Sequence, residues 1–255
     1  MLTLADSHVH LDDVSFDSDR NAVVERALQA GVTVQIIPGV DAASWPRIQA
    51  LCTSGSGLFP AYGMHPMFMD QHRPEHLATL SHWLATQQPV AVGEVGLDFH
   101  AEGLDAEDQR HYFLQQLNLA REFDLPVILH ARAAMDEVTA ALRRIGGLRG
   151  VVHSFAGSQQ QAEQLWKLGF HIGIGGPVTY ERAQRLRRIV AHMPIEYLML
   201  ESDAPDQPLS THRGQRNEPA RVAEVLQCIA ALRGQEPQAI AAATTANVKR
   251  LFALA

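Results

Sequence analysis

Short apolar runs alternate with amphipathic segments along the whole chain. The apolar runs have the length of buried strands, and the segments between them carry apolar residues at helical spacing. Glycine or proline stands at several boundaries, where each ends a helix or opens a strand. We expect strands at residues 4–8, 32–37, 58–62, 90–94, 127–130, 150–153, 171–174 and 197–201. We expect helices at residues 19–30, 43–53, 74–86, 106–123, 133–145, 158–168, 181–192, 218–232 and 237–252.

Strands that alternate with helices form βαβ units and a parallel sheet. Eight such units within 255 residues predict an α/β fold, a closed TIM-type (β/α)₈ barrel. The competing architecture is a doubly wound sheet, which usually carries a glycine-rich phosphate loop after its first strand. The sequence His-Val-His-Leu at residues 8–11 stands at that place. No linker or repeat interrupts the pattern, and we expect residues 1–255 to form a single barrel domain.

Metal-ligating side chains follow the predicted strands. Catalytic groups of a barrel gather at the C-terminal ends of its strands. His8 and His10 are two apart in an extended segment and therefore point to one face. Glu94 lies in a glycine-flanked turn, where its carboxylate is placed to bridge two ions. Four histidines and two carboxylates match a two-metal hydrolytic site. The predicted ligands are His8, His10, Glu94, His130, His153 and Asp203.

Each of these residues has an ordinary alternative when taken alone. A histidine at a strand end is more often a buried or surface polar residue than a ligand, and Asp203 before Pro205 could be a turn residue. Glu94 alone could be an acid at a helix N-terminus. The coincidence of all six at the ends of five predicted strands favours the metal site.

The chain resembles the TatD-type metal-dependent hydrolases and deoxyribonucleases, which are amidohydrolase-like barrels. The loop at residues 102–104 and Met67 after Gly-Met-His-Pro are similar to the YjjV-like branch of that family. Met67 stands where a second histidine is common in the family, which puts a direct role of this loop in doubt. The matching segments are residues 6–11, 62–66, 92–98, 125–132, 152–157 and 200–205, with weaker matches at 216–219 and 247–252.

The resemblance implies two divalent cations. One is held by His8, His10, Glu94 and Asp203, and the second by Glu94, His130 and His153. Mixed histidine and carboxylate ligands accept Zn, Mg, Mn, Ni or Co, so the sequence does not identify the metal.

The resemblance also implies phosphodiester hydrolysis of DNA, of the 3′–5′ exonuclease type. We expect a hydroxide that bridges the metals to attack the phosphate, with Asp203 and Glu94 as the catalytic carboxylates. His65 and Arg132 would bind the substrate phosphate, although Arg132 could equally support a ligand or form a surface ion pair. The roles of Asp98, Glu201, His72 and His100 stay open.

Composition limits the partners. The net charge of −7 argues against extended, metal-free binding of duplex DNA. DNA ends or small nucleotide-like anions remain as phosphodiester substrates, and no obligate protein partner is evident. No apolar stretch reaches membrane-spanning length, and residues 1–10 do not read as a signal peptide. Two cysteines fit a reducing compartment, so we expect a cytoplasmic protein.

Two other functions remain open. Barrels with His-x-His on the first strand also hydrolyse small esters, lactones and amides; many of them bridge their metals with a carboxylated lysine, whereas Glu94 occupies that position here. A non-catalytic metal-binding module is the third possibility. A structural metal site is usually closed, and the predicted ligand set leaves room for water.

Overall fold

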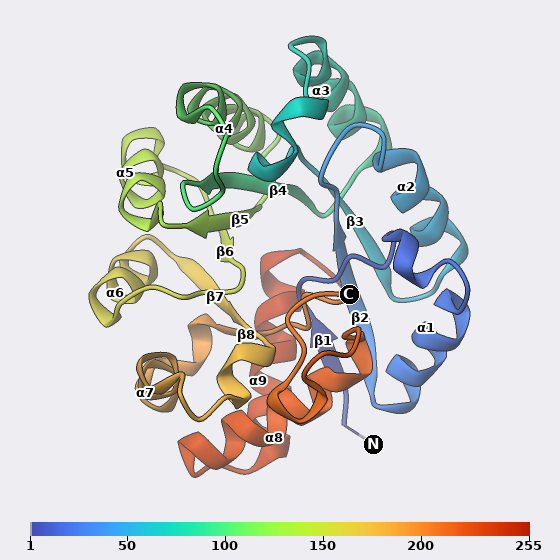
Figure 1. Ribbon diagram of the computed structural model, residues 1–255, viewed down its shortest axis with the longest axis vertical. Helices are drawn as coiled ribbons and strands as arrows, with labels where there is room; N and C mark the ends of the chain where they lie inside the picture. Colours follow the sequence, from blue (N-terminus) through green and yellow to red (C-terminus); the bar gives the residue numbers. More distant parts are fainter. Residues whose placement is uncertain (1) are drawn as a thin grey trace.

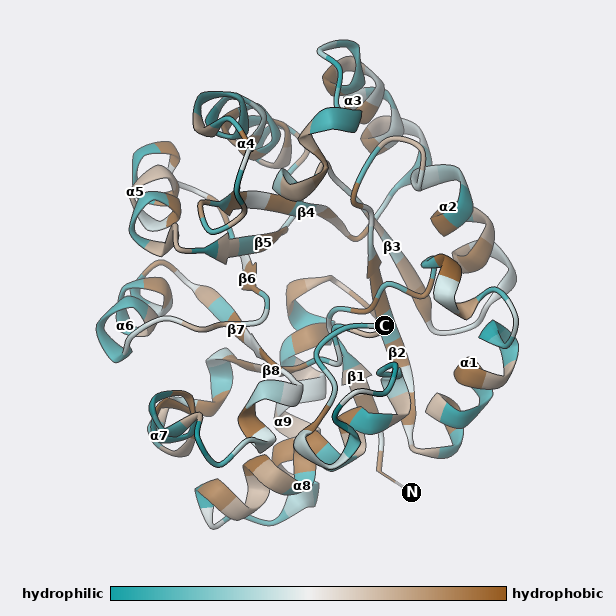
Figure 2. Ribbon diagram, in the orientation of Figure 1, coloured by the Kyte–Doolittle hydropathy of each residue, from teal (hydrophilic) through white to brown (hydrophobic). Residues whose placement is uncertain are grey.

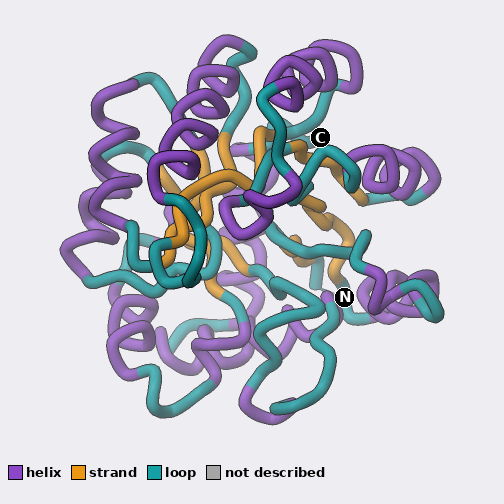
Figure 3. The backbone as a smooth tube through the Cα atoms, turned by 45° about the horizontal axis from the view of Figure 1, so that its top comes forward, coloured by secondary structure: helices purple, strands orange, loops and turns teal. Residues whose placement is uncertain are grey.

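The computed structural model describes residues 2–255. Eight parallel strands follow one another in chain order around the barrel, with the helices outside them (Figures 1 and 3). The strands are β1 (Leu4–Asp6), β2 (Val32–Pro38), β3 (Leu58–Tyr62), β4 (Ala91–Asp98), β5 (Val127–Arg132), β6 (Gly150–Val152), β7 (Phe170–Ile174) and β8 (Leu198–Leu200). The helices are α1 (Arg20–Gln29), α2 (Trp45–Ser54), α3 (Glu75–Gln87), α4 (Ala106–Glu122), α5 (Met135–Ile145), α6 (Gln159–Lys167), α7 (Gln184–His192), α8 (Val222–Arg233) and α9 (Pro237–Leu251). The predicted TIM-type barrel is confirmed.

The outer helices form where the sequence pattern places them. Helix α5 buries Met135, Val138 and Leu142 against the barrel, with acidic residues in its first turn and basic residues in its last. Acidic residues near the N-terminus and basic residues near the C-terminus stabilise the helix through their interaction with its dipole. Figure 2 shows the contrast between apolar strands and polar outer helix faces. Within residues 2–255, none of the helices combines the length and apolar character that crossing a membrane requires.

Strand β4 differs from the prediction. It continues to Asp98, so Glu94 lies within the strand and not in a turn. The pairing of β4 with β5 shifts register between Val92 and Val95, as at a bulge. A Cβ on Gly93 would lie 2.6 Å from Ile128 Cβ, and one on Gly96 would lie 1.9 Å from a backbone oxygen of β5. The two glycines therefore mark close strand contact, which sequence alone does not distinguish from a turn.

Helix α9 closes one end of the barrel. Apolar side chains from the barrel interior form a cluster with Val248 and Leu251 of α9 and with Phe252 directly after it. Thr245 donates to the Thr3 carbonyl ahead of β1, and Asn247 donates to the Leu198 carbonyl at the start of β8. These contacts place α9 at the N-terminal ends of the strands. The opposite end, where the strands finish, is the end at which barrel enzymes carry their active sites.

Buried polar groups join β1 to β8. The Asp6 carboxylate accepts hydrogen bonds from the Ser202 backbone N–H at 2.9 Å and the Ser202 hydroxyl at 2.6 Å. The Asp203 N–H donates to the His8 carbonyl at 2.9 Å. Asp6 lies two residues before His8, and Ser202 lies directly before Asp203, so the same contacts close the barrel and bring His8 beside Asp203.

Candidate metal centre

Histidine and carboxylate side chains gather at the C-terminal ends of the strands, in an open cavity of about 1080 Å³. Groups of three among them lie close enough to share a metal ion, their ligand atoms being within 4.8 Å of one another. His65, which follows β3 and was expected to bind substrate, lies among them. The structure also brings together all six residues predicted as ligands: His8, His10, Glu94, His130, His153 and Asp203.

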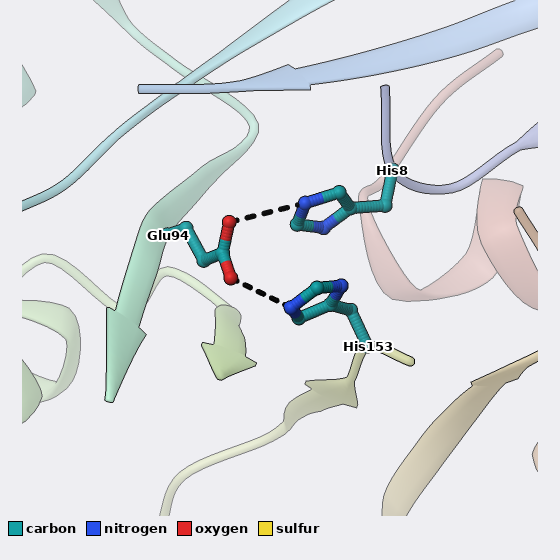
Figure 4. A group of neighbouring side chains, drawn as sticks. All are labelled: His8, Glu94 and His153. Carbon is teal, nitrogen blue, oxygen red and sulfur yellow. Dashed lines mark ion pairs between the residues drawn. The ribbon is translucent and has the colours of Figure 1, made fainter. Parts of the chain in front are cut away.

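Glu94 occupies the middle of the cluster. Its side chain is almost completely buried, and its two oxygens face different histidines (Figure 4). Oε2 lies 3.1 Å from His8 Nε2, and Oε1 lies 2.6 Å from His153 Nε2. The rings of His8 and His153 stack with centroids 3.9 Å apart. A carboxylate shared in this way suits a ligand that bridges two cations.

The first ligand group surrounds Glu94 Oε2. His8 Nε2 and His10 Nε2 are 3.1 Å apart, and Asp203 Oδ1 lies 3.5 Å and 3.7 Å from them. His10 Nε2 lies 3.6 Å from Glu94 Oε2. Asp203 adopts a φ of 56°, in the left-handed region that aspartate enters more readily than most residues. From this backbone position its Oδ1 faces both imidazoles.

The second ligand group surrounds Glu94 Oε1. His130 Nδ1 lies 3.2 Å from this oxygen and 3.2 Å from His153 Nε2. On the other side of the ring, His130 Nε2 lies 2.8 Å from Asp98 Oδ2. Since a carboxylate accepts the Nε2 proton, Nδ1 keeps its lone pair toward the cluster. Asp98 also accepts from two backbone N–H groups of the following turn, so it both orients His130 and caps that turn.

His65 has the opposite proton arrangement. Its Nδ1 accepts a hydrogen bond from the Met67 N–H at 3.1 Å, so the neutral ring carries its proton on Nε2. That nitrogen lies 3.1 Å from Glu94 Oε1. A protonated nitrogen donates to an anionic oxygen and cannot ligate a metal. His65 is therefore suited to an anionic substrate atom, and Met67 contributes through its backbone.

The imidazole nitrogens and carboxylate oxygens of the cluster form a donor set that suits divalent cations. His8 Nε2 and His10 Nε2 face each other and two carboxylate oxygens, an arrangement in which lone pairs converge. His130 Nδ1 and His153 Nε2 converge in the same way beside Glu94 Oε1. A divalent cation gives each set of lone pairs a common partner, and imidazole with carboxylate is a normal donor set for such ions. The residues fit two metal positions on either side of one carboxylate.

Opposite charges set the pKa values in the cluster. Burial lowers the pKa of His153, but the carboxylates of Glu94, Asp203 and Glu201 together outweigh burial and raise this pKa to about 10. Burial raises the pKa of Glu94, but the charges of His153, His65 and His8 hold it well below the usual value. Glu94 is therefore ionised throughout the neutral range, as a metal ligand must be.

Gln207 is a site residue that the sequence did not indicate. Its side-chain amide donates to Asp203 Oδ2 at 2.5 Å and to Ser154 Oγ at 2.6 Å. The amide therefore fixes the outer oxygen of Asp203, while Oδ1 faces the histidines. Gln207 lies in a loop after β8 and belongs to no recognisable motif, so only the folded chain reveals the contact.

Arg132 lies on the wall of the cavity, whereas Glu201 is buried. Arg132 is exposed at the end of β5 and lines the cavity. Across residues 2–255 it forms no ion pair with a carboxylate, so the surface ion pair considered above is absent. Glu201 is buried and accepts from the Ser154 N–H at 2.5 Å. It therefore holds the chain after His153 and does not hydrogen-bond an imidazole.

The two remaining histidines with open roles, His72 and His100, differ in burial. His72 is buried, and its Nε2 lies 2.9 Å from the His65 carbonyl oxygen. His72 thus supports the segment that carries His65. His100 is exposed and does not line the cavity.

Comparison with known proteins gives matches over nearly the whole chain. A family model described as TatD related DNase matches residues 5–253. The uncharacterised metal-dependent hydrolase YjjV of Escherichia coli K12 is 40% identical over 250 residues, covering 97% of this chain and 96% of YjjV. The crystal structure of YjjV aligns with a TM-score of 0.95 at 39% identity, covering 99% of this chain and 98% of that one.

Two further relatives extend the comparison. The 3′-5′ ssDNA/RNA exonuclease TatD of Erwinia billingiae is 37% identical over 257 residues, covering 98% of both chains. Dihydroorotase from Campylobacter jejuni is similar in fold alone, with a TM-score of 0.63 at 13% identity, covering 100% of this chain and 84% of that one. This chain and dihydroorotase thus share the barrel fold.

Proposed function

The chain belongs to the TatD related DNase family and is a metal-dependent hydrolase, and we propose that it is a 3′–5′ exonuclease that removes nucleotides from the end of single-stranded DNA. The observation that supports this most is the buried Glu94 carboxylate, which faces one histidine group with each oxygen at the floor of an open cavity. Two-metal sites of this kind are common in enzymes that cleave phosphodiesters.

Two divalent cations are the proposed cofactors. When bound, such ions lower the pKa of water toward neutrality and offset the negative charge of the phosphoryl oxygens. The residues that would hold one ion are His8, His10, Glu94 and Asp203, and those that would hold the other are Glu94, His130 and His153.

The protein's own side chains supply the remaining steps. Asp203 accepts the proton of the attacking water, because Gln207 fixes its orientation and a carboxylate within hydrogen-bond reach acts as a general base. Neutral His65 donates a hydrogen bond from its Nε2–H to a phosphate oxygen of the substrate. Arg132, on the cavity wall, binds phosphate with its planar guanidinium group.

Charge and cavity shape favour a strand end as substrate. The net charge of −7 opposes extended electrostatic binding along a duplex. A cavity at the mouth of a barrel accepts the last nucleotides of a single strand without such binding. The curated TatD relative from Erwinia billingiae bears a matching name, 3′-5′ ssDNA/RNA exonuclease. The cytoplasmic location stays a prediction.

A labelled oligonucleotide tests the proposed function. Wild-type protein is incubated with a single-stranded 20-mer that carries a 5′ fluorophore, in the presence of Mg²⁺, Mn²⁺, Zn²⁺ or Co²⁺. We expect a ladder of products shortened stepwise from the 3′ end, and its loss on chelation. The matched control carries a 3′ phosphorothioate cap, which blocks removal of the terminal nucleotide.

Two other outcomes would change the assignment. Internal cleavage of the capped strand would replace the exonuclease by an endonuclease. Intact DNA with every metal, from a folded and metal-loaded protein, would contradict the nuclease proposal. Turnover of small carboxyl esters, lactones or amides would then favour the second hydrolase class.

A further inference from the structure

A second cavity of about 390 Å³ lies beside the metal centre, where the chain after β6 meets β7 and the start of α7. In Figure 1 these elements lie side by side along one part of the barrel. Phe155, Ile174 and Leu186 contribute apolar surface to it. The volume lies within the roughly 300–1,000 Å³ of small-molecule sites, and the lining gives a flat group such as a nucleobase apolar surface to pack on.

The two cavities are adjacent and share part of their wall. Ser154 and Ala156 line both of them. Ser154 follows the proposed ligand His153 directly, and its hydroxyl is hydrogen-bonded to Gln207, which in turn holds Asp203. A substrate whose phosphate lies at the metal centre therefore has only the Ser154–Ala156 wall between its reacting group and the second cavity.

Two arginines give the second cavity a positive rim. Arg182 and Arg185 both line it and are exposed. The Arg182 guanidinium lies 5.4 Å from the centre of the Tyr180 ring, and Arg185 donates to the Ala156 carbonyl at 2.8 Å. In the described part of the chain neither pairs with a carboxylate, although acidic residues outnumber lysine and arginine, 28 to 21. Both keep further N–H donors for an anion.

We infer that this cavity is a second substrate subsite, which takes the nucleobase adjacent to the cleaved nucleotide, while Arg182 and Arg185 bind the phosphate beside that base. The subsite rests on the proposed exonuclease function. Arginine is suited to the role because its planar fork binds phosphate bidentately. Packing of a base on an apolar wall is tolerant of sequence because every base has an apolar face, so the subsite would bind strands without selecting a base.

The test compares two variants within residues 182–188, which include the start of α7. The double variant Arg182→Ala/Arg185→Ala removes the rim, and Arg188→Ala removes an exposed arginine of α7 that does not line the cavity. Fluorescence anisotropy gives the Kd of fluorescein-labelled pentathymidylate in EDTA, between 50 and 300 mM NaCl. Initial rates on oligonucleotide and on bis-p-nitrophenyl phosphate with Mn²⁺ give kcat/KM, and circular dichroism confirms folding.

We expect the double variant to bind pentathymidylate about tenfold more weakly at 50 mM NaCl. The slope of log affinity against log salt should become shallower by about 0.7, the value for the loss of one phosphate contact with a single strand. Its kcat/KM on the oligonucleotide should fall about tenfold relative to that on bis-p-nitrophenyl phosphate. Arg188→Ala should match the wild type in slope.

The outcomes separate the subsite from the proposed function. An unchanged slope and Kd in the double variant would overturn the subsite while leaving the exonuclease intact. An equal change in Arg188→Ala would also overturn it, since general charge would then explain binding. A changed slope in a protein that binds the strand but does not cleave it would support the subsite and contradict the exonuclease.

Discussion

Glu94→Ala is expected to lower phosphodiester hydrolysis by at least about a thousandfold, because both metal positions depend on this one carboxylate. Oε2 faces the His8 group and Oε1 faces the His153 group, so one truncation removes a donor from each. The side chain is buried among histidines, and its loss also removes the negative charge that balances two cations. The measurement is kcat/KM on an oligonucleotide and on bis-p-nitrophenyl phosphate, together with metal content after dialysis.

Glu102→Ala is the matched control for Glu94→Ala. Glu102 is exposed in the loop after β4 and should keep wild-type activity and metal content. A folded Glu94→Ala protein that keeps both metals, or that turns over substrate at more than about a tenth of the wild-type rate, would contradict the bridging role. Thermal unfolding of both variants separates a metal defect from a folding defect.

Asp203→Asn should lower kcat by about 10²- to 10⁴-fold, the usual contribution of a positioned general base. Asparagine keeps an oxygen at the same place, and Gln207 can still hold the side chain by exchanging its amide orientation. The variant should therefore keep both metals and a KM close to that of the wild type. This pattern, a fall in kcat without a fall in metal content, separates proton transfer from ligation.

Asp206→Asn is the control for Asp203→Asn, since Asp206 is exposed three residues further on and lines the same cavity. It should change kcat by less than about threefold. If Asp203→Asn instead lost one metal and its activity recovered at high metal concentration, Asp203 would be a ligand only. A different group would then have to accept the proton.

The barrel could be predicted because its strands are short apolar runs with clear breaks. β3 has the predicted bounds, and α6 begins directly after its capping residue Ser158, where the predicted helix at residues 158–168 begins. Glu94 shows the limit of this reasoning. Glycine before and after it is typical of a turn, whereas the structure uses Gly93 and Gly96 to bring β4 and β5 together. The distance between β4 and β5 decides between a turn and a close strand contact, and the spacing of residues in the sequence does not reveal that distance.

The clustering of the proposed ligand set could be predicted because the C-terminal ends of the strands meet at one end of a barrel. The protonation of its histidines could not, because it depends on contacts formed only on folding. Asp98 directs His130 to the cluster through Nδ1, and the Met67 N–H leaves His65 a donor at Nε2. Gln207 reaches Asp203 from a loop without a motif, so it was missed entirely.

The most direct test of the account is the position of the metals. Crystals grown with Mn²⁺ or Zn²⁺ would be measured with X-rays at the absorption edge of the metal. The account predicts two anomalous peaks per chain, one between Glu94 and the His8–His10 pair and the other between Glu94 and the His130–His153 pair. A single peak, or two peaks away from Glu94, would contradict the two-metal centre.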